Sequence, residues 1–180
     1  MGIEPGDQSV DFELLNANAN TGSKKMSLGE CMGENGLVVV FECNHCPYVV
    51  ASFARLEHMA NVCRDLGIGF VGINSNDSNQ YPDDSFENMQ KRTEKGMNYP
   101  YLHDESQSVA EDWGAERTPE VYLLNNEGVV VYRGRIDNSP REPNGVSKRD
   151  LMDAIDAHVM GESPPVSRTK SIGCSVKWKM

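Results

Sequence analysis

Residues 37–50, LVVVFECNHCPYVV, place a Cys-x-x-Cys motif directly after an apolar run. The run Leu37–Phe41 has the continuous hydrophobicity of a strand that is covered on both faces. Two cysteines three positions apart, where a strand passes into a helix, can close a disulfide and open it again. The free N–H groups and positive dipole end of a helix start favour a thiolate over a thiol. The segment therefore predicts thiol redox chemistry at Cys43 and Cys46.

The sequence that follows the motif predicts an α/β fold. Apolar residues from Val49 to Cys63 recur at spacings of four and three, which indicates one helix with a buried stripe. Residues 68–73 form a second apolar run, so strand, helix and strand make a βαβ unit with parallel pairing. Residues 121–124 and 129–132 flank the turn sequence NNEG and predict an antiparallel hairpin.

Three further helices are expected in the second half of the chain. One spans 83–95, with the aspartate at its first position as the cap. A short one follows Asp104, which is placed to form a capping box with Gln107. The last spans Ser147–Met160 and is capped by its first residue.

The ends of the chain are predicted to differ from this regular pattern. The turn-rich residues 16–23 predict an N-terminal hairpin. We expect residues 1–161 to form one domain and residues 162–180, which contain Pro164-Pro165, to form an irregular tail. The tail is also locally basic.

Composition narrows the classes of function. The formal charge of −10 disfavours a nucleic-acid partner, because phosphates attract a basic surface. The chain has no run of about 18 apolar residues, so no membrane span is expected. The N-terminus lacks the basic and apolar regions of a signal peptide, and five cysteines are an odd number for a disulfide framework. We therefore expect a cytoplasmic protein with reduced thiols and one working pair.

Four segments together resemble one protein family. They are FECNHCPYV at 41–49, Thr-Pro-Glu at 118–120, YRGRID at 132–137 and SIGCSVKW at 171–178. In this order the chain resembles the peroxiredoxin-like (AhpC/TSA-type) proteins of the thioredoxin superfamily, over nearly its whole length. The resemblance implies a thioredoxin-like fold with an N-terminal β-hairpin, a helical insertion and a C-terminal tail.

The resemblance also assigns positions around the motif. Thr118 and Pro119 would position the substrate, since the corresponding proline is usually cis and lies against the reactive disulfide. Two features depart from the family pattern. Cys43 stands where peroxiredoxins carry the threonine that helps to position peroxide. The buried acid of thioredoxin has no clear counterpart, because strand alternation would aim Glu42 differently from Cys43.

The leading hypothesis is a thiol–disulfide oxidoreductase. Cys43 would be the exposed thiolate that attacks a substrate disulfide, and Cys46 would resolve the mixed disulfide. His45 precedes the second cysteine, and a cationic imidazole there would stabilise the thiolate. The partners would be client disulfide proteins and an external reductant such as a thioredoxin system.

A thiol peroxidase is the first alternative. Pro47 suits the first position of a helix, which would make Cys46 the N-cap and the peroxidatic residue. Its sulfenic acid would condense with Cys43 or Cys174. Small peroxides would then be the substrates, and Arg117 and Arg135 are candidates for the arginine that a peroxidatic site needs.

A redox-silent binding protein is the second alternative. Zinc sites need four ligands and usually two cysteine pairs, so one pair predicts no metal site. No organic cofactor is expected either.

The three other cysteines are given less prominent roles. Cys31 and Cys63 are interpreted as unreactive buried thiols. Cys174 is either a resolving thiol, which Lys170 and Lys177 would make more acidic, or a packed residue of the tail.

Overall fold

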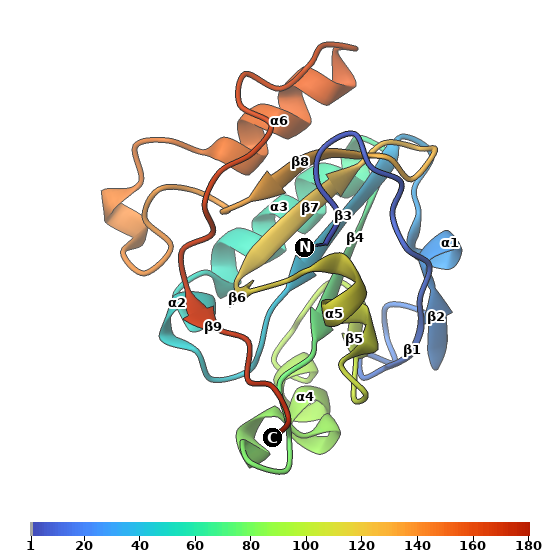
Figure 1. The fold of residues 1–180 in the computed structure, drawn as a ribbon, viewed down its shortest axis with the longest axis vertical. Helices are drawn as coiled ribbons and strands as arrows, with labels where there is room; N and C mark the ends of the chain where they lie inside the picture. Colours follow the sequence, from blue (N-terminus) through green and yellow to red (C-terminus); the bar gives the residue numbers. More distant parts are fainter. Residues whose placement is uncertain (1) are drawn as a thin grey trace.

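A mixed β-sheet forms the centre of the structure, a computed structural model that describes residues 2–180 (Figure 1). Its strands are β1 (Glu13–Asn16), β2 (Lys25–Ser27), β3 (Gly36–Phe41), β4 (Ile68–Asn74), β5 (Tyr101–His103), β7 (Glu120–Leu124) and β8 (Val130–Gly134). They lie in the order β2-β1-β5-β4-β3-β7-β8. A separate two-stranded sheet pairs β6 (Arg117–Thr118) with β9 (Cys174–Ser175).

Strand β3 lies in the middle of the sheet, and all of its residues are buried. It pairs in parallel with β4 and antiparallel with β7, so that Val39 faces Val71 on one side and Tyr122 on the other. The predicted βαβ unit is confirmed, as is the hairpin of β7 and β8. The N-terminal hairpin is also confirmed, since β1 pairs antiparallel with β2.

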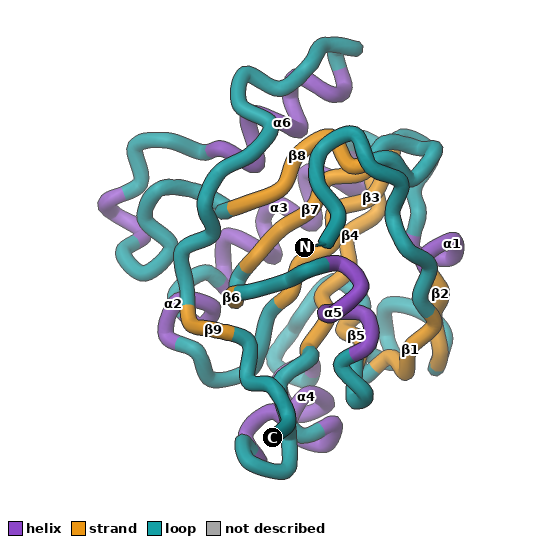
Figure 2. The backbone as a smooth tube through the Cα atoms, in the orientation of Figure 1, coloured by secondary structure: helices purple, strands orange, loops and turns teal. Residues whose placement is uncertain are grey.

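Helices cover both faces of the sheet (Figure 2). They are α1 (Leu28–Cys31), α2 (Pro47–Val50), α3 (Phe53–Asp65), α4 (Phe86–Thr93), α5 (Ser108–Trp113) and α6 (Asp150–Val159), with short 3₁₀ turns η1 (Pro82–Asp84) and η2 (Pro143–Gly145). Alternate side chains of β3 enter two cores. Val38 and Val40 pack with residues of α3 and α6, whereas Val39 and Phe41 pack with Trp113 of α5.

Several helix boundaries differ from the sequence predictions. The helix expected after the motif is two helices, α2 and α3, with a turn at residues 51–52. Ser52 lies at that turn and donates from Oγ to the Tyr48 carbonyl at 2.7 Å, a local bond that competes with helix continuation. Helix α4 is capped by Ser85 rather than by the first residue of 83–95.

The other two caps also differ from expectation. Asp104 caps α5 directly, because its carboxylate accepts from the N–H groups of Val109 and Ala110. Gln107 has a positive φ of 68° and makes no side-chain cap, so the expected capping box is wrong. Helix α6 begins at Asp150, later than predicted, because Ser147 bonds to Asn138 in the preceding loop.

The C-terminal tail returns across the molecule after α6 and ends beside α4 (Figure 1). It is loop except for β9 and an isolated bridge to β8. Asp77 N–H donates to the Lys177 carbonyl at 2.8 Å, and Val176 is buried. The tail is thus held beside β6 by β9, and beside the loop that follows β4 by Lys177. Within residues 2–180, no helix combines the length and apolar character that crossing a membrane requires.

Candidate active site

The two motif cysteines lie at the carboxyl end of β3, beside Thr118. Cys46 is the N-cap of α2, and Pro47 occupies the first helical position, as predicted. The Cys43 Sγ lies 3.7 Å from the Thr118 hydroxyl, and the Cys46 Sγ lies 3.6 Å from the Thr118 carbonyl, which only a protonated Cys46 can use. Cys43 is 0% exposed and Cys46 is 2% exposed. The expectation that Cys43 is the exposed sulfur is therefore wrong.

The Thr118–Pro119 peptide bond is cis, as the resemblance implied. The buried Glu120 holds the preceding backbone, since its Oε1 accepts from the N–H groups of Glu116 and Arg117 at 2.8 and 3.3 Å. Its other oxygen accepts from Arg133 at 2.9 Å. This buried ion pair fixes the segment that faces the two sulfurs.

The electrostatics of the pair favour the thiolate on Cys46. The neighbouring Cys43 thiol, with weaker contributions from Cys174 and the Val49 N–H, lowers the pKa of Cys46 to about 4, against the effect of burial. The proximity of Cys46, together with burial and the charge of Asp84, raises the pKa of Cys43 far above its ordinary range. Burial and its contact with Cys46 raise the pKa of Cys174 to about 11.

His45 and Asp84 hold the loop between the cysteines. The His45 Nδ1 lies 2.8 Å from the Asp84 Oδ2. Asp84 is fully buried and also accepts from the Asn44 N–H at 2.7 Å and from the side chains of Asn74 and Asn76 at 3.2 and 3.0 Å. The imidazole therefore contacts this carboxylate, which orients the loop.

A metal ion would find three donor groups in the same place. The Cys43 sulfur, a His45 ring nitrogen and an Asp84 oxygen lie within 4.8 Å of one another. Zinc sites usually have four ligands, and both oxygens of Asp84 already accept hydrogen bonds. The observed contacts thus suit loop positioning, and the absence of a resident metal stays a prediction.

A buried ion pair underlies the motif. Glu42 is fully buried, its Oε1 lies 2.6 Å from the Arg92 Nη2, and its Oε2 accepts from the Tyr99 hydroxyl at 2.9 Å. Burial raises the pKa of Glu42 above its ordinary value, while Arg92 and Tyr99 oppose that shift. The sequence predicted no counterpart of thioredoxin's buried acid, but a buried acid is present one residue before Cys43.

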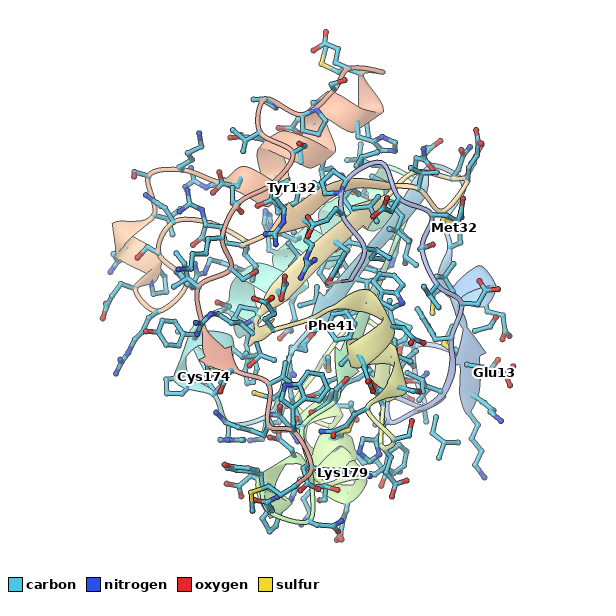
Figure 3. The ribbon with its side chains drawn as sticks, in the orientation of Figure 1. Glu13, Met32, Phe41, Tyr132, Cys174 and Lys179 are labelled. Atoms are coloured by element: carbon cyan, nitrogen blue, oxygen red, sulfur yellow. The ribbon has the colours of Figure 1, made fainter. Side chains whose placement is uncertain are left out.

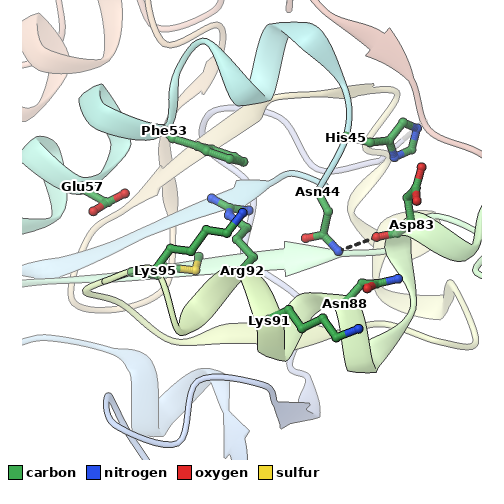
Figure 4. Close-up of a pocket in the computed structure, with 10 residues that line it drawn as sticks. Asn44, His45, Phe53, Glu57, Asp83, Asn88, Lys91, Arg92 and Lys95 are labelled. Atoms are coloured by element: carbon green, nitrogen blue, oxygen red, sulfur yellow. Dashed lines mark hydrogen bonds between the residues drawn. The ribbon is translucent and has the colours of Figure 1, made fainter.

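Arg92 connects this pair to the motif loop. Its guanidinium lies 3.9 Å from the Phe53 ring centre and 4.7 Å from that of Tyr101, and its Nη1 donates to the Cys43 carbonyl at 3.4 Å. Figure 4 shows Arg92 beside Phe53. Both residues line a cavity of about 330 Å³, together with Asn44 and His45. A bond of 2.8 Å from the Asn44 amide to the Asp83 carbonyl joins two of its lining residues.

The two accessory residues named from the sequence lie at the tail. Arg117 donates from Nη1 to the Gly173 carbonyl at 3.1 Å, so it supports the tail backbone. Cys174 is half-buried and packs against the cluster of Cys43, Cys46 and Val49. Strand β9 brings it there by pairing Cys174 with Thr118 (Figures 1 and 3).

Sequence reasoning missed Arg92 and Asp84. A signal for Arg92 was present, since it follows Phe86 and Met89 at spacings of three on the inner side of α4. A charge on such a stripe implies a buried partner of opposite sign. Asp84 lies in η1 and carries no such periodic signal.

Comparison with known proteins identifies the family. The model of the Redoxin family matches residues 4–149. The chain belongs to the Redoxin family. An uncharacterized conserved protein from Geobacillus kaustophilus is 39% identical over 98% of this chain and 93% of its own, with a TM-score of 0.90. A hypothetical protein from Sinorhizobium meliloti 1021 is 35% identical over 99% of this chain and 97% of its own, with a TM-score of 0.89.

More distant structures share the thioredoxin-like fold. The thioredoxin domain of a thiol-disulfide oxidoreductase from Bacteroides vulgatus is 18% identical over 73% of this chain and 89% of its own, with a TM-score of 0.59. No curated protein matches the chain. The predicted thioredoxin-like fold and peroxiredoxin-like family are confirmed, and this Redoxin protein is a thiol-dependent oxidoreductase or peroxidase.

Proposed function

We propose that the protein is a thiol–disulfide oxidoreductase in which Cys46 attacks the substrate and Cys43 resolves the intermediate. The lowered pKa of Cys46, whose largest cause is the neighbouring Cys43 thiol, carries this assignment, because it favours the thiolate on Cys46. The position of Cys46 as the N-cap of α2 supports it, since the helix start favours a negative charge. The order of attack is the reverse of the leading sequence hypothesis.

The reaction balances within the pair. The Cys46 thiolate attacks one sulfur of a disulfide, forms a mixed disulfide and releases the first substrate thiolate. Cys43 then loses its proton to that thiolate and attacks the Cys46 sulfur. The Cys43–Cys46 disulfide forms, the second substrate thiolate leaves, and two electrons have passed from the dithiol to the substrate.

The surrounding residues act as positioning groups in this proposal. Thr118 and Pro119 face the sulfurs from β6. His45 and Glu42 act through Asp84 and Arg92 on the loop and backbone of the motif. The pair returns to the dithiol form through an external reductant such as a thioredoxin system. Five free thiols favour a reducing, cytoplasmic setting.

Peroxide reduction is the second candidate function. The burial of both sulfurs favours a small substrate. Pro47 at the first helical position gives Cys46 the N-cap position expected of a peroxidatic cysteine. The Cys46 thiolate would attack one peroxide oxygen and release water or an alcohol, with the proton taken from Cys43 or solvent. Cys43 would then condense with the Cys46 sulfenic acid and release a second water.

Serine variants test the order of attack. With a small aromatic disulfide, Cys43→Ser should accumulate a mixed disulfide on Cys46, and Cys46→Ser should lose the reaction. Cys63→Ser is the matched control, because Cys63 is buried in α3 away from the pair. Mass spectrometry identifies the trapped cysteine. A mixed disulfide trapped on Cys43 in the Cys46→Ser variant would refute this order, and rapid consumption of hydrogen peroxide without disulfide turnover would favour the second candidate.

A further inference from the structure

A cavity of about 410 Å³ lies between α2 and the tail segment that leads into β9. Its lining includes Tyr48 on one side and Gly173 on the other. Tyr48 and Cys174, the residue after Gly173, both pack against the cluster that contains Cys46. The cavity therefore adjoins the reactive sulfur, on the side where the tail runs.

The charged side chains that line this cavity are all positive. They belong to Arg117, Arg135 and Lys170. Arg117 bonds to the neutral Gly173 carbonyl and has no ion-pair partner among residues 2–180, whereas Arg135 pairs with Asp150 at 2.6 Å. The formal charge of the whole chain is −10. A positively charged cavity on a protein of negative net charge creates a local positive electrostatic potential, which would attract an anion to the cavity.

A second observation points to a ligand with acceptor atoms. Ser171 lines the same cavity and is 8% exposed. Its buried hydroxyl has no hydrogen-bond partner within residues 2–180. A buried hydroxyl without a partner costs free energy, and rotation of this side chain toward the cavity that it lines would let a bound group with a lone pair satisfy it.

We propose that this cavity binds the carboxylate of a small disulfide substrate, with Lys170 and Arg117 supplying charge and Ser171 a hydroxyl donor. The inference rests on the proposed function and adds the substrate class to it. Tyr48, which lines the cavity, packs against the cluster of Cys46, so the disulfide of a molecule held there by its carboxylate would have to reach the sulfur past this side chain. The electron transfer is the exchange described above, with the carboxylate unchanged.

Two disulfides of similar size and opposite charge test the proposal. They are 3,3′-dithiodipropionate, an anion, and cystamine, a cation. We expect the kcat/KM of the wild-type protein to be higher for the anion, and Lys170→Glu to lower the ratio of the two values by roughly threefold to tenfold, since the charge changes by two. Lys24→Glu is the matched control, because Lys24 is an exposed lysine in the turn before β2, an edge strand of the seven-stranded sheet, whereas β9 belongs to the separate two-stranded sheet.

Adipate, a dicarboxylate without sulfur, separates this inference from the proposed function. It should inhibit turnover of dithiodipropionate competitively, and its binding, measured by calorimetry, should weaken roughly threefold in Ser171→Ala. Equal kcat/KM values for the two disulfides, or adipate binding that Lys170→Glu and Ser171→Ala leave unchanged, would overturn the inference. Adipate binding that these variants weaken, without turnover of any disulfide, would support the cavity and refute the proposed function.

Discussion

The variant Arg92→Met would leave the carboxylate of Glu42 buried without its ion-pair partner. Both side chains are nearly inaccessible, at 9% and 0% exposed, and their atoms lie 2.6 Å apart. Removing one member of a buried pair costs about 3–5 kcal/mol, because the remaining charge stays desolvated. For a chain of this size that corresponds to a melting temperature lower by roughly 6–20 °C. Methionine fills a similar volume, so little of the loss would come from packing.

The loss should depend on pH with a definite sign. The folded-state pKa of Glu42 lies above its ordinary value of 4.5 because of burial, and Arg92 opposes that shift. Without Arg92 the folded-state pKa rises further, so the folded variant binds a proton that the unfolded chain has released. Its stability therefore falls as pH rises through the interval from 4.5 to the raised pKa. Arg92→Met should be less destabilised near pH 5 than near pH 8.

Urea denaturation at the two pH values measures both effects. Lys91→Met, on the same helix, is the matched control, since its pair with Glu87 is 3.8 Å long and the two side chains are 64% and 80% exposed. That variant should lose only about 0.3–0.5 kcal/mol. An Arg92→Met protein as stable as the control at pH 8, or one destabilised more at pH 5 than at pH 8, would refute the reasoning.

Three further outcomes follow from the site. Because the pKa of Cys46 is about 4, its alkylation by iodoacetamide should be nearly constant between about pH 6 and pH 8, where an ordinary thiol gains about tenfold per unit; a tenfold rise per unit would contradict the low pKa. Deleting residues 174–180 should cost at least about 2 kcal/mol, the contribution of buried Val176 alone, measured by urea denaturation, and should raise the rate of insulin-disulfide reduction. Gly72→Ala should cost about 1–3 kcal/mol in the same assay, because its Cβ would press on the Glu42 carboxylate.

Local patterns predicted the elements that position the pair. The continuous apolar runs of β3 and β4 fix a buried parallel pair, and the turn between β7 and β8 fixes a hairpin. The N-cap position of Cys46 follows from Pro47 alone. Each of these features depends on residues close together in the chain, and a single sequence therefore contains them.

The electrostatics of the cysteine pair depend on contacts between residues far apart in the chain. Sequence reasoning therefore assigned the exposed sulfur to the wrong cysteine. The expectation that the first cysteine of the motif is exposed fails here because Thr118 of β6 lies against Cys43, and β9 of the tail pairs with β6. Strand alternation predicted only that Glu42 points away from Cys43. It could not predict that Arg92, fifty positions later in the chain, would form an ion pair with Glu42. Pairings of this kind are set by how α4 packs on the sheet.

Strand β9 occupies the backbone edge of Thr118, where an incoming polypeptide would otherwise add a strand. An intruding chain must therefore compete with a segment that is tethered to the same molecule, whose effective concentration for a short connection is of order millimolar. A molecule too small to need that edge meets no such competitor. We therefore expect the covalent continuity of the tail to act as a filter by size at the Thr118 edge.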